Sequence, residues 1–162
     1  APERVSKLVL INSDGYTQSA LSMPLAFQMA GARGWRWVAE RIMPKAVVAS
    51  SVRSVYGDPS KVTADKIERY YQLNLRVGNR KALFLRMDQA QFGYSANLIR
   101  RIQQPTLVLW GDKDKMNSPE HAEYFCRDIV RCKLVRLPEL GHIPQEEDPV
   151  GTLAASRAFL AR

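Results

Sequence analysis

The sequence predicts an α/β protein: a parallel sheet of three strands with flanking helices, interrupted by an inserted all-helical segment. Short apolar runs rich in β-forming residues occur at 5–11, 106–110 and 134–137. Such runs are typical of strands that are buried on both faces. Residues between the first two runs show helical periodicity instead. The chain therefore divides into a core strand and turn (1–15), a helical insertion (16–103) and a C-terminal core (104–162).

The first strand is predicted at Val5–Ile11, and the turn residues Asn12-Ser13-Asp14-Gly15 lead out of it. Pro2-Glu3-Arg4 is interpreted as the end of a helix.

The helical insertion is clearest at Thr63–Val77, where four apolar residues share one face and Gly78 ends the helix. Those four residues are Ile67, Tyr70, Tyr71 and Leu75. Asn79 is the expected cap of the next helix, whose apolar face includes Leu83, Met87 and Ala90. A shorter amphipathic helix is predicted at Gly34–Met43, before Pro44.

The C-terminal core alternates strand and helix. Ser118 is the expected N-cap of a helix with Pro119 at its first position. The residues expected to face the sheet from this helix are Ala122, Phe125, Cys126 and Ile129. Asp148 and Pro149 begin the last helix in the same way, with Leu153, Ala154 and Ala158 expected to point inward.

Two acids and a histidine follow these strands. Asp112 and Asp114 come just after the run 106–110, and Gly141-His142 lies beyond the run 134–137. In an open parallel sheet, chemistry gathers outside the carboxyl ends of the strands. We therefore expect an acid–histidine pair at this edge of the sheet.

The segments WGDKD (Trp110–Asp114) and ELGH (Glu139–His142), with the helix and strand between them, resemble the C-terminal half of an α/β-hydrolase. The resemblance covers residues 5–160. It implies that Asp114 is the catalytic acid, that His142 is the catalytic histidine, and that the insertion is a cap, or lid, over the substrate pocket. Asp112 is interpreted as a turn former that bonds its own backbone. Asn117 and Ser118 depart from the family, which often has an apolar residue and a proline there.

The nucleophile of that family sits on a G-x-S-x-G turn or its aspartate variant, and the sequence contains neither this elbow nor the oxyanion loop. Ser13 and Ser118 are not candidates, because neither lies on such a turn. We interpret the chain as a fragment, or as one half of a split protein that needs the N-terminal half or a swapped copy of itself.

A serine nucleophile implies hydrolysis of an ester, amide or carbon–carbon bond, whereas an aspartate nucleophile implies epoxide or haloalkane substrates. The alternative is a fragment or binding protein without activity.

A small apolar ester-like molecule is the substrate that the resemblance implies. Apolar residues of the insertion are candidates to line its pocket or, equally, to form the core of the cap: Met23, Phe27, Met29, Trp35 and Trp37. Tyr56, Tyr94, Asn12 and Ser13 are further candidates for polar substrate contacts, none of them favoured.

The net charge is +8, yet Lys and Arg are spread over the whole chain without interleaved aromatics, so we expect no nucleic-acid binding. No apolar run is long enough to span a membrane.

With two histidines and no zinc-like spacing, we expect neither a metal site nor a cofactor. Cys126 and Cys132 are expected to be reduced thiols, a disulfide being the alternative in an oxidising compartment. His121 is expected to be solvated. No leader is visible at residues 1–10, which does not identify the compartment if the natural chain begins further upstream. The cytoplasm is taken as the default.

Overall fold

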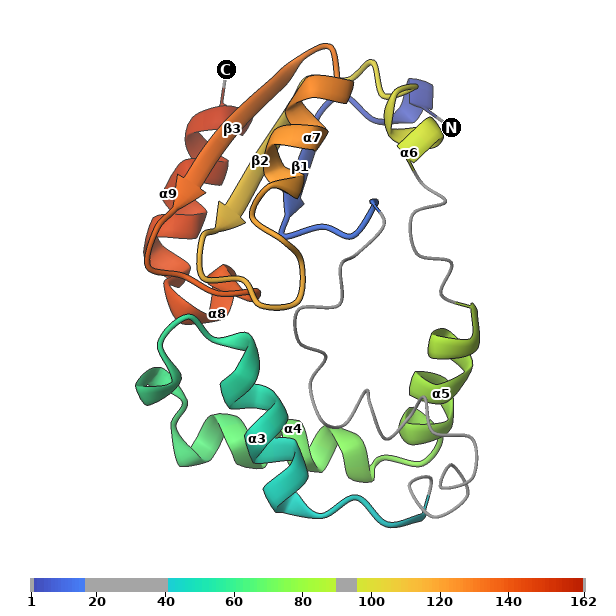
Figure 1. Ribbon diagram of the computed structural model, residues 1–162, viewed down its shortest axis with the longest axis vertical. Coiled ribbons are helices and arrows are strands. Elements are labelled where there is room, and N and C mark those ends of the chain that lie inside the picture. Colours follow the sequence, from blue (N-terminus) through green and yellow to red (C-terminus); the bar gives the residue numbers. More distant parts are fainter. Residues whose placement is uncertain (1, 17–40, 90–95, 162) are drawn as a thin grey trace.

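The computed structural model describes residues 2–16, 41–89 and 96–161. Its sheet contains β1 (Leu8–Ile11), β2 (Thr106–Gly111) and β3 (Cys132–Leu137), all parallel and in the order β1-β2-β3 (Figure 1). The predicted α/β fold with three parallel strands is confirmed. β1 begins later than predicted, because the chain before it starts with the 3-10 helix η1 (Pro2–Arg4), whose Pro2 carbonyl accepts from the Val5 N–H.

The central strand β2 is buried along its whole length. Successive side chains of a strand point to opposite faces, and Val108 and Trp110 belong to the core on one of them. Helix α7 (His121–Asp128) covers this face. Helix α9 (Pro149–Leu160) also contacts β2 and lies behind the sheet in the view of Figure 1. The sheet is thus enclosed by helices, as buried parallel strands require.

Helix α7 presents the predicted apolar face to the sheet, with Ala122, Phe125 and Ile129 buried and Cys126 packed against them. Its start differs from the prediction. Ser118 does not cap the helix, because Ser118–Glu120 forms a turn whose Ser118 carbonyl accepts from the His121 N–H.

The expectation of reduced thiols is wrong. Cys126 in the last turn of α7 and Cys132 at the start of β3 form a disulfide, with their Cα atoms 5.0 Å apart. The two residues meet because the chain reverses directly from the helix into the strand, a connection that spacing along the sequence does not reveal.

The helical segment contains α3 (Lys45–Val55), the 3-10 helix η3 (Pro59–Lys61), α4 (Ala64–Leu75) and α5 (Asn79–Gln89). Figure 1 shows α3 and α4 beyond the arrowheads of the strands, at the carboxyl edge of the sheet. They have a core of their own, formed by Met43, Val48, Ala49, Val52, Tyr56, Val62 and Ile67. The short helices α6 (Ala96–Ile99) and α8 (Pro144–Glu147) belong, with the three strands, α7 and α9, to the sheet-forming part of the chain.

The predicted helix at 63–77 is confirmed within two residues, since Thr63 caps α4 through the Lys66 N–H and Gly78 follows with φ +88°. In α5 the buried residue is Phe84, with Leu83 and Met87 only partly buried, and Ala90 lies outside the described residues. The predicted helix at 34–43 also falls almost entirely outside them.

The inward face predicted for the last helix is wrong. Asp148 does cap α9 by accepting from the Gly151 N–H, but Thr152 is the buried residue and Leu153 is 53% exposed. Ala154 and Ala158 are exposed too. The face of α9 that is turned to the sheet is thus rotated away from its predicted apolar residues. The positions of hydrophobic residues in the sequence do not reveal this rotation. Within the described ranges, no helix is both long and apolar enough to cross a membrane.

Candidate active site

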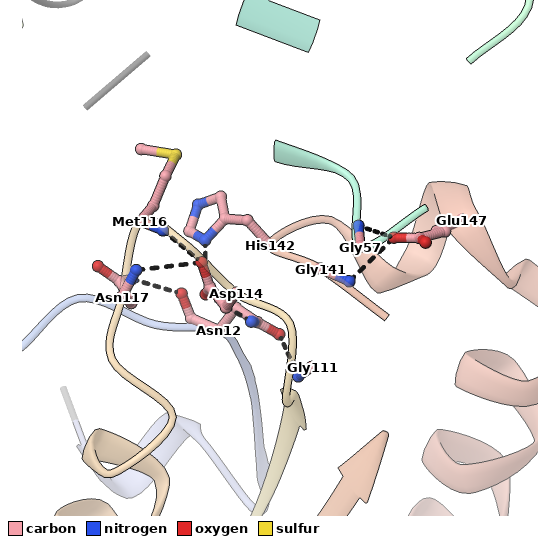
Figure 2. A network of polar contacts seen from close by, with 9 residues as sticks. All are labelled: Asn12, Gly57, Gly111, Asp114, Met116, Asn117, Gly141, His142 and Glu147. Carbon is pink, nitrogen blue, oxygen red and sulfur yellow. Dashed lines mark hydrogen bonds and ion pairs between the residues drawn. The ribbon is translucent and has the colours of Figure 1, made fainter. Parts of the chain in front are cut away.

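The acid and the histidine meet at the carboxyl edge of the sheet. Gly111 and Leu137 are register partners at the ends of β2 and β3, and beyond them the Lys113 N–H donates to the Leu140 carbonyl. These contacts hold the two loops together, so that Nδ1 of His142 lies 2.9 Å from Oδ2 of Asp114 (Figure 2). The structure therefore brings together the two residues that the sequence predicts as a pair.

The Asp114 carboxylate accepts four hydrogen bonds, two at each oxygen. Oδ1 accepts from the backbone N–H groups of Met116 (2.8 Å) and Asn117 (3.1 Å). Oδ2 accepts from the Asn12 amide (2.6 Å) and from His142. The side chain has no solvent exposure. A carboxylate offers about four lone-pair sites, so this group is fully used and fixed in orientation.

Asn12 supports the acid from the end of β1. Its Nδ2 donates to Asp114, its Oδ1 accepts from the Gly111 N–H at 3.1 Å, and its own carbonyl accepts from Asn117 Nδ2 at 2.8 Å. Its φ of +43° lies in the left-handed region, which Asn adopts more readily than most residues. Asn12 is therefore part of the support of the acid rather than a substrate contact.

His142 is held on its backbone side by the helical segment, because its N–H donates to the Val55 carbonyl at 2.8 Å. Its side chain is 23% exposed. An ionised carboxylate only accepts hydrogen bonds, so Nδ1 carries the hydrogen toward Asp114. Nε2 is turned away from the acid (Figure 2). In the neutral ring, Nε2 keeps a lone pair, as a general base requires.

Close backbone packing explains the glycine of the ELGH segment. A Cβ on Gly141 would lie 2.3 Å from the Gly57 nitrogen, and a Cβ on Gly111 would lie 2.2 Å from the Gly141 carbonyl oxygen. Only glycine permits such approaches of one backbone to another. The loop that carries His142 is therefore wedged between the end of β2 and the turn after α3.

Several expectations for neighbouring residues change. Asp112 does not bond its own backbone. Its carboxylate pairs with Arg136 Nε of β3 at 2.6 Å. His121 is buried rather than solvated, beside the rings of Tyr16 and Tyr124. The hydroxyl of Tyr56, a fully buried residue, bonds Glu146.

The candidate pocket residues Met23, Phe27, Met29, Trp35 and Trp37 lie outside the described residues, as does Tyr94. Among the residues that are described, no group of three or more His, Cys, Asp or Glu side chains is arranged to hold a metal ion.

Three polar residues of the site have supporting roles that the sequence analysis did not predict. Asn12 and Asn117 support the acid, and Glu147 accepts from the Gly141 N–H at 2.9 Å. The role of Asn12 could have been predicted from the sequence, because Asn12 directly follows a strand at the same sheet edge as Asp114. The role of Glu147 could not be predicted from the spacing of residues, because its hydrogen-bond partners are backbone groups.

Residues 1–149 match the family model described as the alpha/beta hydrolase fold. This match covers most of the sequence, so the chain belongs to the α/β-hydrolase family. The chain is 34% identical over 64 residues to "Lipase 3" of Moraxella sp. (strain TA144), a stretch that covers 40% of this chain and 20% of the lipase. It is 24% identical over 148 residues to the "Uncharacterized hydrolase YugF" of Bacillus subtilis (strain 168), covering 91% of this chain and 54% of that protein.

Among solved structures, a serine hydrolase involved in carbazole degradation (CarC enzyme) matches with a TM-score of 0.74 and 25% identity. The match covers 97% of this chain and 54% of that one. The chain thus spans about half the length of the hydrolases that it matches along most of its sequence.

Proposed function

We propose that this chain supplies the acid and the base of a hydrolase that cleaves carboxylic esters or related acyl or carbon–carbon bonds. The observation that carries the proposal is the contact of His142 Nδ1 with a buried, fully hydrogen-bonded Asp114 carboxylate at the carboxyl edge of a parallel sheet. In a nucleophile–acid–histidine triad, the acid holds the imidazole in one tautomer and stabilises the imidazolium. Membership of the α/β-hydrolase family and the similarity to a lipase support this class of reaction.

In this proposal, Nε2 of His142 takes the proton of a hydroxyl nucleophile as its oxygen attacks the substrate carbonyl. The imidazolium then gives that proton to the leaving alcohol, and an acyl-enzyme remains. Water repeats the cycle: His142 removes its proton, the hydroxide oxygen bonds the acyl carbon, and the nucleophile recovers its hydrogen. Asp114 stays ionised throughout and stabilises each imidazolium.

The nucleophile comes from a segment other than these 162 residues, because the sequence contains no G-x-S-x-G or G-x-D-x-G turn. The proposed partner is the nucleophile-bearing half of the same hydrolase, or a second copy that exchanges segments. The partial exposure of all four residues of β1 supports the addition of a strand there. The substrate class proposed is a small apolar ester, held by the helical cap.

A pair of isosteric substitutions tests the roles. Asp114→Asn removes the acceptor charge at the histidine, whereas Asp112→Asn changes a neighbouring acid that pairs with Arg136. With the purified protein and p-nitrophenyl esters of increasing chain length, Asp114→Asn and His142→Ala should each lower kcat by roughly a hundredfold or more, and Asp112→Asn should not.

The intact-mass spectrum of the same sample identifies every polypeptide present, and a fluorophosphonate probe labels a serine nucleophile. Labelling of a serine, together with loss of turnover in Asp114→Asn and His142→Ala, supports a serine hydrolase. Turnover without labelling that still depends on Asp114 supports an aspartate nucleophile, which epoxide and haloalkane substrates then test. Turnover that survives both substitutions, or its absence from a sample that holds the nucleophile-bearing segment, overturns the proposal in favour of a non-enzymatic binding role.

A further inference from the structure

Glu147, the last residue of α8, is a buried acid whose carboxylate is directed at backbone rather than at side chains. Oε2 accepts from the N–H groups of Gly57 and Gly141, both at 2.9 Å (Figure 2), and Oε1 accepts from the Asp58 N–H at 2.8 Å. Three backbone dipoles thus surround one negative charge. Such convergent N–H groups form an anion-binding concavity, and here a side chain of the same chain fills it.

The three donors belong to two segments that are distant in the sequence. Gly57 and Asp58 follow α3 and belong to the helical segment, whereas Gly141 immediately precedes His142. The His142 N–H donates to Val55 at the end of α3, and Ile143 packs against the core of the helical segment. The backbone on both sides of the histidine is therefore attached to the turn after α3, and Glu147 bridges that attachment.

We propose that Glu147 is a positioning residue, which locks the His142 loop to the turn after α3 and makes the direction of the imidazole depend on the placement of the helical cap. An effect of Glu147 on catalysis rests on the function proposed above, but its effect on the orientation of the His142 loop does not. Without the carboxylate, three partly or fully buried N–H groups lose their acceptor, and a buried donor without a partner is costly. The loop would then relax, and with it the 2.9 Å contact between Nδ1 and Asp114.

The neighbouring acid shows that this role is specific. Glu146 accepts from the Tyr56 and Tyr70 hydroxyls at 3.2 and 3.1 Å and from the Arg69 guanidinium at 2.7 Å. These partners are side chains of the helical segment, and none of them belongs to the loop that carries the histidine. Glu146 anchors α4, whereas Glu147 holds the backbone at the histidine itself.

The test uses Glu147→Gln with Glu139→Gln as its matched control. A glutamine has the shape of the glutamate, but its NH2 group must face at least one of the three N–H donors, so at least one hydrogen bond becomes a donor–donor contact. Glu139 lies in the same loop, its side chain is 77% exposed, and it pairs with Lys113 on the surface. Glu147→Asp, which keeps the charge but is one methylene shorter, serves if the glutamine variant does not fold.

The first readout is the exchange of the His142 Nδ1 proton with water, followed by NMR on protein labelled with 15N in its histidines. The sequence has two histidines, so His121 serves as the internal reference. We expect exchange at His142 to become at least about tenfold faster in Glu147→Gln, with His121 unchanged and Glu139→Gln like the parent. A folded Glu147→Gln with unchanged His142 exchange overturns the proposal. So does an equal effect in Glu139→Gln.

The second readout is hydrolysis by the complete protein. Misplacement of a catalytic group by about 1 Å can cost on the order of a hundredfold, so Glu147→Gln should lower kcat by about tenfold to a hundredfold while KM stays within about twofold. A rise in KM alone would assign Glu147 to substrate binding and refute the positioning role. If the parent protein lacks turnover but His142 exchange still responds to Glu147→Gln, the positioning role stands and the proposed hydrolase function fails.

Discussion

The disulfide between Cys126 and Cys132 should stabilise the chain by an amount that depends on the loop that it closes. The two cysteines are six positions apart and join the end of α7 to the start of β3. The bond restricts the unfolded chain, and the chain-entropy relation for a loop of seven residues gives a loss of about 8 cal/mol/K, or about 2 kcal/mol at 25 °C. For a chain of this size, that difference corresponds to about 4–8 °C in Tm.

The comparison that isolates this contribution uses one sequence in two redox states. Urea unfolding, followed by circular dichroism with and without a phosphine reductant, should show a lower midpoint for the reduced chain with a similar slope. The variant Cys126→Ser/Cys132→Ser should unfold at the same midpoint with and without the reductant, which controls for direct effects of the reagent.

Two results would refute the reasoning. Titration of two free thiols in the unreduced, denatured protein would show that the bond does not form. Alternatively, a bond that is present but whose reduction leaves the midpoint unchanged would mean that the loop 126–132 is already restricted in the unfolded chain. An intact bond in the isolated protein would also indicate synthesis or storage in an oxidising environment, contrary to the default expectation of the cytoplasm.

Two further predictions concern buried polar residues. Asn12→Ala should lower the free energy of unfolding by about 1–3 kcal/mol, because the Gly111 N–H and the Asp114 carboxylate lose a buried partner. Asn12→Gly, which tolerates φ +43°, should be similarly destabilised in urea unfolding, and parent-like stability of both variants would show that these bonds contribute little. Burial lowers the pKa of His121 below its ordinary value of 6.5, so the unfolded chain binds more protons than the folded one and stability should fall as the pH drops below about 6.5. His121→Gln should weaken that dependence between about pH 7.5 and 5.5, and an equal slope in parent and variant would contradict it.

The strands and the acid–histidine pair could be predicted because their signals are local. Thr106–Trp110 is apolar throughout and bounded by Pro105 and Gly111, and the loops after neighbouring parallel strands lie at one edge of the sheet. Topology and two short segments are therefore enough to predict the contact of Asp114 with His142. The start of β1 was predicted too early, at Val5 instead of Leu8, because the apolar run from Val5 does not show where strand pairing begins.

The errors have a common physical origin in contacts that do not depend on local pattern. His121 carries a polar ring, yet it packs beside Tyr16 and Tyr124. The burial of Thr152 in place of Leu153 and the union of Cys126 with Cys132 likewise depend on where neighbouring elements lie. Single-residue polarity and periodicity describe one element at a time, and these three features belong to the junctions between elements.

The site also divides into two supports that act on different members of the pair. The acid is fixed by the sheet-forming part, through Asn12 at the end of β1 and the N–H groups of Met116 and Asn117. The histidine is fixed by the junction with the helical segment, through Val55 and Glu147. The acid should therefore keep its orientation when α3 is displaced relative to the sheet, while the imidazole should follow the turn after α3. In the hydrolase proposed above, the position of α3 would then set the direction of the base against a stationary acid, and with it the geometry of proton transfer.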